Sequence, residues 1–322
     1  MHKVEEKFFV SGQIFPSDIK NLKEQGFQTI VCNRPNGEEE GQPIYAEIEK
    51  TCKENDIKCF FIPISPGEID PAKVFELNLV SVIGKNEKTE AICNSLNDNQ
   101  IKTKYLIMKG KQNDAYLSIE KNSGEIFGSI NSSHVFLSNL NAIKENFLQI
   151  CLMHKKNHSS ATLIFDGNCP REFLDFVKKE TTEDIFTKYF IPANFSKLIE
   201  FENDPEYFKG FNLFINLKEA NILLGSKFRK NSVDASKAIF KKIETATNVV
   251  VVTDGPNVAC GVNKEQIVKV KPSRIKGNVS RLGAGDAFFA YFLSHKELNP
   301  DASLEEMLFA ADKKTQEFLE KK

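Results

Sequence analysis

Four residues near the end of the chain have the types and order that phosphoryl transfer requires: Gly283, Ala284, Gly285 and Asp286. Small residues let the backbone approach a phosphate closely. The first N–H groups of a following helix have no internal partner and point toward an anion, and the acid could accept the proton of a substrate hydroxyl. The same residues also fit a glycine turn in which Asp286 is a helix N-cap, so by themselves they leave both interpretations open.

Asn216 and Glu219 form a second pair with a suitable spacing, directly after an apolar run. Three residues apart on the first turn of a helix, their side chains can face the same point. An amide and a carboxylate suit a hydrated magnesium ion or its waters, not a closed metal cage. The alternative interpretation is a helix cap with a solvent-facing Glu219.

Thr253 and Gly255 stand at the end of another apolar run and before a second short strand. A turn of this kind could bend under the β- and γ-phosphates of a nucleotide. An ordinary hairpin turn is the alternative interpretation. Asp166 and Asn168 follow a third apolar run in the same way.

The elements that must position these residues alternate between strand-like and helix-like runs, which predicts an α/β fold with a mostly parallel sheet. The predicted strands cover residues 29–32, 59–64, 161–165, 211–215 and 248–252, a helix covers 17–25, and strands 116–119 and 125–130 form a hairpin around Asn122, Ser123 and Gly124. Three of the strands lead to Asp166, Asn216 and Thr253. Because open α/β sheets bind ligands at the carboxyl ends of their strands, we expect these residues at one crevice.

The composition is that of an ordinary soluble protein. The chain has 322 residues, 41% hydrophobic and 27% charged, with a net charge of −1, so we expect no nucleic-acid polymer as a partner. No apolar run is long enough to cross a bilayer, and the first residues lack the apolar core of a signal peptide. We therefore expect a cytoplasmic protein without a membrane partner.

Neither cysteine nor histidine spacing indicates a disulfide framework or a closed metal site. The seven cysteines are scattered and never spaced as Cys-x-x-Cys, which favours reduced structural thiols. His154 and His158 have a spacing that could bind a metal on a helix. The residues around His158 are more typical of a helix that ends and runs into a loop.

From about residue 80 onward the chain resembles the PfkB, or ribokinase-like, carbohydrate and nucleoside kinases, and within them the pseudouridine kinases. The resemblance is carried by residues 81–84, 116–130, 165–168, 191–197, 216–219 and 283–286. It implies a ribokinase-like three-layer sandwich, ATP and Mg²⁺ as cofactors, and a small-molecule sugar or nucleoside as the substrate.

The resemblance also implies a role for each candidate residue. Asp286 would be the base for the substrate hydroxyl, and the backbone of Gly283, Ala284 and Gly285 would form the anion hole. Asn216 and Glu219 would hold magnesium, through water, together with the phosphates. Thr253 and Gly255 would line the nucleotide phosphates, and Asp166 and Asn168 would lie at a neighbouring strand end on the substrate side.

Two departures from the family pattern bear on activity. Arg281 and Leu282 stand where the family usually has a pair of threonines. Ahead of residue 80 there is also no strand with a substrate-binding acid and no Gly-Gly-x-x-x-Asn segment. A catalytically degenerate nucleotide-binding or protein-interaction scaffold is therefore the alternative to an active kinase.

Residues 8–78 resemble the phosphatase-like domain of beta-lactamase hydrolase-like proteins, through residues 9–13, 22–30, 33–39 and 62–64. In that chemistry a cysteine thiolate attacks phosphate from a loop closed by an arginine six positions later. None of the seven cysteines has arginine at that position, which disfavours a phosphoester hydrolase. We expect a phosphatase-like segment over residues 1–79 and a kinase domain over 80–322, and the sequence leaves open whether the chain forms a homodimer.

Overall fold

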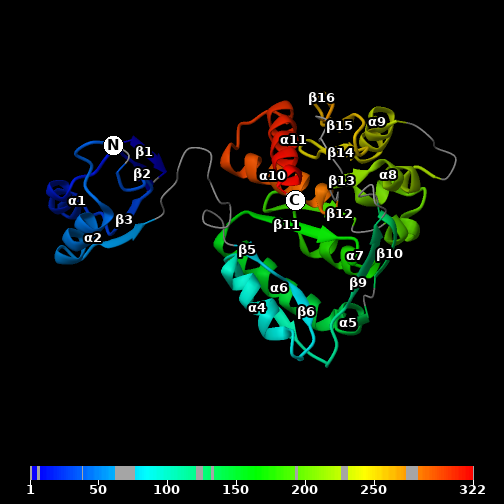
Figure 1. Ribbon diagram of the computed structural model, residues 1–322, viewed down its shortest axis with the longest axis horizontal. Helices are drawn as coiled ribbons and strands as arrows, with labels where there is room; N and C mark the ends of the chain where they lie inside the picture. The colour runs from blue at the N-terminus through cyan, green and yellow to red at the C-terminus, as the bar shows by residue number, and fades with distance from the viewer. Residues whose placement is uncertain are drawn as a thin grey trace. The chain divides into compact units, whose positions relative to one another are not determined.

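The computed structural model describes residues 2–5, 8–37, 39–61, 77–120, 126–131, 134–192, 195–225, 231–272 and 282–321 (Figure 1). The chain divides into two compact units. One comprises Met1–Leu77 with Asn97–Lys102, and the other comprises Asn78–Leu96 with Thr103–Lys322. Each unit has a hydrophobic core of its own.

The first unit is small and contains two pairs of strands. The antiparallel pair is β1 (His2–Glu5) with β2 (Phe8–Val10), and the parallel pair is β3 (Thr29–Cys32) with β4 (Lys58–Phe61). The helices are the 3-10 turn η1 (Pro16–Asp18), α1 (Ile19–Glu24) and α2 (Tyr45–Glu54). The buried core consists of Ile19, Leu22, Ile30, Ile48, Cys52 and Ile57.

Further short strands and helices lie between residues 77 and 208, and of these β7 (Ile101–Lys102) and the end of α4 (Thr89–Asp98) belong to the first unit. The two-stranded pairs are β5 (Leu77–Asn78) with β7 (Ile101–Lys102), the parallel β6 (Ser81–Ile83) with β8 (Leu106–Met108), and the antiparallel β9 (Tyr116–Glu120) with β10 (Ile126–Asn131). The helices are α4 (Thr89–Asp98), α5 (His134–Ser138), and the 3-10 turns η2 (Phe195–Phe201) and η3 (Pro205–Phe208).

A six-stranded sheet forms the centre of the second unit. Its strands, in spatial order, are β11 (Ala161–Asp166), β12 (Phe186–Ile191), β13 (Asn212–Asn216), β14 (Val250–Thr253), β15 (Ala259–Val262) and β16 (Ile267–Val270). The first four are parallel and the last two connections are antiparallel. The carboxyl ends of β11 to β14 therefore share one edge of the sheet.

Helices cover both faces of this sheet, as the alternation of its side chains requires. In β13, Leu213 and Ile215 enter one core and Phe214 enters the other. The first core includes residues of α6 (Leu140–Asn157), α7 (Arg171–Glu180), α8 (Leu217–Leu223) and α9 (Ser232–Ile243). The second includes residues of α10 (Ala284–Leu298) and α11 (Leu304–Glu320), orange and red in Figure 1. The predicted α/β three-layer sandwich is confirmed.

Aromatic rings hold α10 on the sheet. The Phe214 ring centroid lies 4.6 Å from that of Phe292 and 5.0 Å from that of Phe289. The Tyr189 ring lies 5.4 Å from Phe289. Such pairs add to the free energy gained by burying the rings, so α10 has a defined seat over β12 and β13.

Most predicted elements are confirmed, with shifted ends. The predicted strand 29–32 is β3, and the strand before Asp166 is β11. The strand predicted over 248–252 begins at Val250, and the helix predicted over 17–25 opens as a 3-10 turn. The hairpin strands form as β9 and β10, whereas its turn at 121–125 and residues 62–64 lie outside the described residues.

The histidine and cysteine residues do not form a metal cluster in the described part of the chain. The helix α6 ends at Asn157, as the residues around His158 predict, and His154 Nδ1 lies 2.9 Å from Ser159 Oγ. The seven cysteines are free thiols. No described helix combines the length and the apolar character that a bilayer crossing needs.

Replacing Phe214 with alanine should lower the free energy of unfolding by about 3 kcal/mol or more, because the lost ring leaves a cavity between β13 and α10. Urea denaturation followed by circular dichroism measures the change. The matched control is Phe309→Ala on α11. Phe309 is 49% exposed, so this substitution should lower the free energy of unfolding by less than about 1 kcal/mol. Equal losses in both variants would contradict the packing described for α10.

Candidate functional site

The candidate residues at the strand ends lie on one edge of the sheet. Asn216 and Thr253 are directly paired in the parallel register of β13 and β14. Asp166 ends β11, where it pairs with Ile191 of β12. With strands about 4.8 Å apart, Asp166 is two strands away from Asn216. The three polar strand ends therefore share one edge of the sheet, and their meeting at one crevice stays a prediction.

Asn216 and Glu219 hold each other at the start of α8. Asn216 Oδ1 accepts a hydrogen bond from the Glu219 N–H at 3.0 Å, and Glu219 Oε2 accepts one from the Asn216 N–H at 2.8 Å. This reciprocal pair is a capping box. The Glu219 side chain is only 5% exposed, so the alternative of a solvent-facing glutamate is wrong, although the cap itself is present.

The surroundings of Glu219 change its acidity. Burial raises the pKa of Glu219 to about 7 from its usual 4.5, against the hydrogen bonds from Asn216, which lower it. The nearby charge of Asp286 raises the pKa further. Glu219 and Asp286, 67 residues apart in the numbering, are therefore close enough for their charges to interact. The fold thus brings the carboxyl groups of Glu219 and Asp286 within electrostatic range of each other.

The start of α10 has the geometry of an anion-binding turn. Gly283 is the N-cap with φ of 77°, a left-handed conformation that favours glycine. Asp286 lies exposed in the first turn, so the alternative in which Asp286 is the N-cap is wrong. A Cβ built on Gly285 would meet no atom within 4 Å. The backbone at Gly285 is therefore accessible to a ligand on the side where the side chain of a larger residue would lie.

Thr253 and Gly255 belong to the turn between β14 and β15. The Asn257 N–H donates to the Asp254 carbonyl at 2.9 Å, and Asn257 Nδ2 donates to Asp254 Oδ2 at 3.1 Å. Gly255 has φ of 53°. The hairpin alternative is thus correct as a description of the backbone, and the turn lies at the same sheet edge as Asn216.

Asp166 and Asn168 form a local turn after β11. Asp166 Oδ1 accepts from the Asn168 N–H at 3.0 Å, and Asp166 Oδ2 accepts from Asn168 Nδ2 at 2.9 Å. The Cys169 N–H donates to the Asp166 carbonyl at 3.2 Å. These bonds fix the carboxylate at the sheet edge, and its proposed contact with substrate stays a prediction.

Two cavities lie beside elements of the second unit. A cavity of about 640 Å³ borders the Thr253–Gly255 turn and is lined by polar residues that include Asp254, Asn257, Lys237 and Lys269. Sequence reasoning did not single out the two lysines, because one lies on α9 and the other on β16, with no motif that links them.

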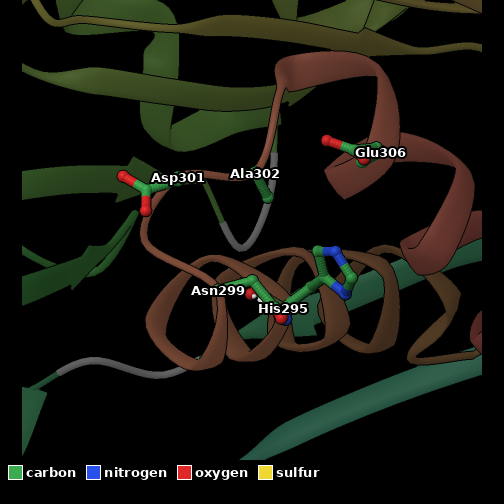
Figure 2. A pocket seen from close by; sticks show the side chains of 5 residues that line it. All are labelled: His295, Asn299, Asp301, Ala302 and Glu306. Atoms are coloured by element: carbon green, nitrogen blue, oxygen red, sulfur yellow. Dashed lines mark hydrogen bonds between the residues drawn. The ribbon is translucent and has the colours of Figure 1, made fainter.

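The second cavity, of about 490 Å³, lies at the connection between α10 and α11. Figure 2 shows its lining, with His295 near the end of α10 and Glu306 on α11. Asn299 Nδ2 donates to the His295 carbonyl at 3.0 Å. At 1.5 Å per residue, α10 separates this cavity from Gly283 by about 20 Å. The hollow is therefore not part of the site around Asp286.

The donor set of the site suits a hard cation. Glu219 and Asp286 supply carboxylate oxygens, and Asn216 supplies an amide oxygen. Oxygen donors that leave room for water are what Mg²⁺ requires. The Asn216 oxygen already accepts the Glu219 N–H, so the set fits a hydrated ion held partly through water.

Comparison with known proteins gives this geometry a context. The profile of the pfkB family carbohydrate kinases matches residues 74–314, which is most of the chain. The chain belongs to the pfkB family. Its candidate residues 283–286 and 216–219 both lie within the matched segment.

Solved structures confirm the ribokinase-like fold. The chain is similar to a carbohydrate kinase from Agrobacterium tumefaciens (17% identity, 75% of this chain and 73% of that one, TM-score 0.55). It is also similar to a ribokinase from Thermotoga maritima (16%, 74% and 72%, TM-score 0.52). An adenosine kinase from Trypanosoma brucei brucei aligns over 96% of this chain and 94% of its own, with 13% identity and a TM-score of 0.57.

The front of the chain matches a different family. The profile of the beta-lactamase hydrolase-like protein, phosphatase-like domain, covers residues 1–95. A beta-lactamase hydrolase-like protein from Agrobacterium fabrum is 32% identical over 72 residues, which are 22% of this pfkB-family chain and 17% of that relative. The chain thus spans about a sixth of this relative's length. The match does not supply a cysteine followed six positions later by arginine.

The Glu219 carboxyl should make stability depend on pH. The pKa of Glu219 is higher in the folded protein than in the unfolded chain. The stabilisation that this shift gives the folded protein is therefore fully present below about pH 4.5 and is lost as the pH rises through about 7. The variant Glu219→Gln can retain the capping box and serves as the reference. Between pH 4.5 and 7.5, the free energy of unfolding of the wild type should fall by up to about 3 kcal/mol relative to that of the variant.

Urea denaturation at both pH values, without divalent cations, measures this difference. The control is Glu265→Gln at an exposed position of the β15–β16 turn, which should keep the wild-type pH dependence. If Glu219→Gln and the wild type show the same change with pH, the burial of Glu219 does not penalise its charge.

Proposed function

We propose that this pfkB-family protein transfers the γ-phosphoryl group of ATP to a hydroxyl of a sugar or nucleoside, with Mg²⁺, and that pseudouridine is the first candidate acceptor. The observation that carries the proposal is the buried Glu219, held by Asn216 at the end of β13, together with the exposed Asp286 in the first turn of α10, whose charge acts on Glu219. Family membership supports a kinase, and the resemblance to pseudouridine kinases supports the narrower choice of acceptor.

In the proposed reaction, Asp286 accepts the proton of the acceptor hydroxyl as its oxygen bonds to the γ-phosphorus, and the bond from that phosphorus to the bridging oxygen of ADP breaks. The first N–H groups of α10 face the charge that develops on the phosphoryl oxygens. Asn216 and Glu219 would hold the magnesium ion, which neutralises phosphate charge when bound. Thr253 and Gly255 would line the nucleotide phosphates.

The acceptor would lie between Asp286 and the strand end that carries Asp166 and Asn168. The polar side chains of these two residues are fixed by the turn after β11, which suits recognition of hydroxyl groups. Cytoplasmic location and a homodimer stay predictions.

Turnover of ATP with pseudouridine, ribose and adenosine, measured by coupled ADP release, tests the proposal. The wild type should phosphorylate at least one acceptor, and Asp286→Asn should lower the rate by about 100-fold or more because it removes the base. The control Asp301→Asn changes a carboxylate in the connection between α10 and α11 and should leave the rate unchanged. Equal rates for wild type and Asp286→Asn would remove Asp286 as the base.

A second candidate is a nucleotide-binding scaffold without transfer activity. It is favoured by Arg281 and Leu282 in place of the family's threonines, and by a front segment that matches another family. Calorimetry with Mg·ATP separates the two. Binding of ATP without transfer to any of the acceptors would favour the scaffold, whereas robust turnover would exclude it.

Gly285→Ala separates the role of the anion hole from folding. The new Cβ meets no protein atom within 4 Å, and alanine is favoured over glycine within a helix by about 1 kcal/mol. Stability should therefore stay constant or rise. Phosphoryl transfer should fall by more than about tenfold, because the methyl group occupies the side of the backbone that a phosphate approaches. Unchanged turnover would mean that the phosphoryl group does not lie against Gly285.

A further inference from the structure

The end of α10 opposite to Asp286 is bonded to two neighbouring strands. Lys296 Nζ donates to the Tyr189 hydroxyl of β12 at 2.9 Å. The next residue, Glu297, accepts from the Thr162 hydroxyl of β11 at 3.0 Å through its Oε1. Consecutive residues of one helical turn thus hold two adjacent strands.

The Tyr189 bond is the less exposed of the two, because the tyrosine is buried and Lys296 is partly buried. The Tyr189 side chain is 1% exposed, whereas the Thr162–Glu297 bond is exposed. Burial raises the pKa of Tyr189, against the opposing effect of Lys296, so the phenol is protonated and accepts the lysine hydrogen bond with its oxygen. A buried hydroxyl bonded to an ammonium group is among the stronger hydrogen bonds in proteins.

Ring packing and hydrogen bonding constrain the position of α10 on the sheet in different ways. The contacts of Phe289 with Tyr189 and Phe214 hold the helix against the sheet, but apolar contact is not directional. A hydrogen bond is directional and has a narrow range of lengths. The bond to Tyr189 therefore adds a directional constraint, along the strands and about the helix axis, to the position that the ring contacts give α10.

We propose that Tyr189 and Lys296 are positioning residues for Asp286, because their hydrogen bond sets the register of α10 on β12. Lys296 lies ten positions after Asp286, which is about 15 Å along the helix, and a helix moves as a stiff rod over this length. A shift at Lys296 is thus transmitted to Gly283 and Asp286. The expected effect on the rate of phosphoryl transfer rests on the proposed function, whereas the expected effect on the position of α10 does not.

Tyr189→Phe is the direct test, since it removes only the hydroxyl and keeps the ring. The kcat should fall by about tenfold or more, because small misplacements of a catalytic group are costly, while the KM for ATP should change by less than about twofold. Lys296→Met should show the same loss, and the double variant should lose no more than either single one. Lys296→Arg, which retains a donor, should recover most of the rate.

The matched control is Tyr291→Phe on α10 itself. Tyr291 is partly buried beside the same core, and its hydroxyl makes no hydrogen bond in the part of the chain that is described. This variant should keep the wild-type kcat. A loss of thermal stability in Tyr189→Phe with an unchanged kcat would reduce the bond to a structural role and overturn the proposal.

Hydrogen–deuterium exchange gives a readout that does not depend on turnover. Backbone amides of residues 287–293, which are hydrogen-bonded within α10, should exchange about tenfold faster in Tyr189→Phe than in the wild type or Tyr291→Phe, as expected for the loss of a charged hydrogen bond. Unchanged exchange would overturn the proposal even for an active kinase. Faster exchange in a protein without turnover would support the positioning and contradict only the proposed function.

Discussion

The parallel pairing of β13 with β14 is the constraint on which the rest of the site depends. It sets Asn216 beside Thr253 at one edge, and the period of two along β13 puts Phe214 and Asn216 on the same face. Phe214 is the ring on which α10 packs, and Asn216 caps α8. One strand therefore positions both helices whose first turns carry Asp286 and Glu219, and a shift in its register would separate them.

The ionised form of Glu219 is costly in the folded protein. Glu219 is buried, and the charge of Asp286 adds to the cost of ionising it. A proton or a cation at Glu219 would relieve this cost. Such perturbed groups gather at functional sites. The capping hydrogen bonds of Asn216 offset part of the cost and hold the Glu219 carboxyl in a fixed orientation.

The two family matches describe a chain with a kinase-like body and an unrelated front. The two matches overlap between residues 74 and 95, a segment that includes β5, β6 and the start of α4. Each compact unit buries its own apolar residues. The front unit has a much smaller core than the second, and a core this small gives a correspondingly marginal stability.

The sequence by itself determined the strand ends at Asp166, Asn216 and Thr253 and the presence of a helix next to the glycine turn, but not that the helix begins at Ala284, ahead of Asp286. These features depend on apolar runs, polar caps and turn glycines within a few residues of each other, and such signals are local. Only the tertiary structure decided that Glu219 is buried, that Asp286 lies close to it, and that Lys296 bonds Tyr189 across 107 residues. Those contacts follow from how helices pack on a sheet, which no short stretch of sequence specifies.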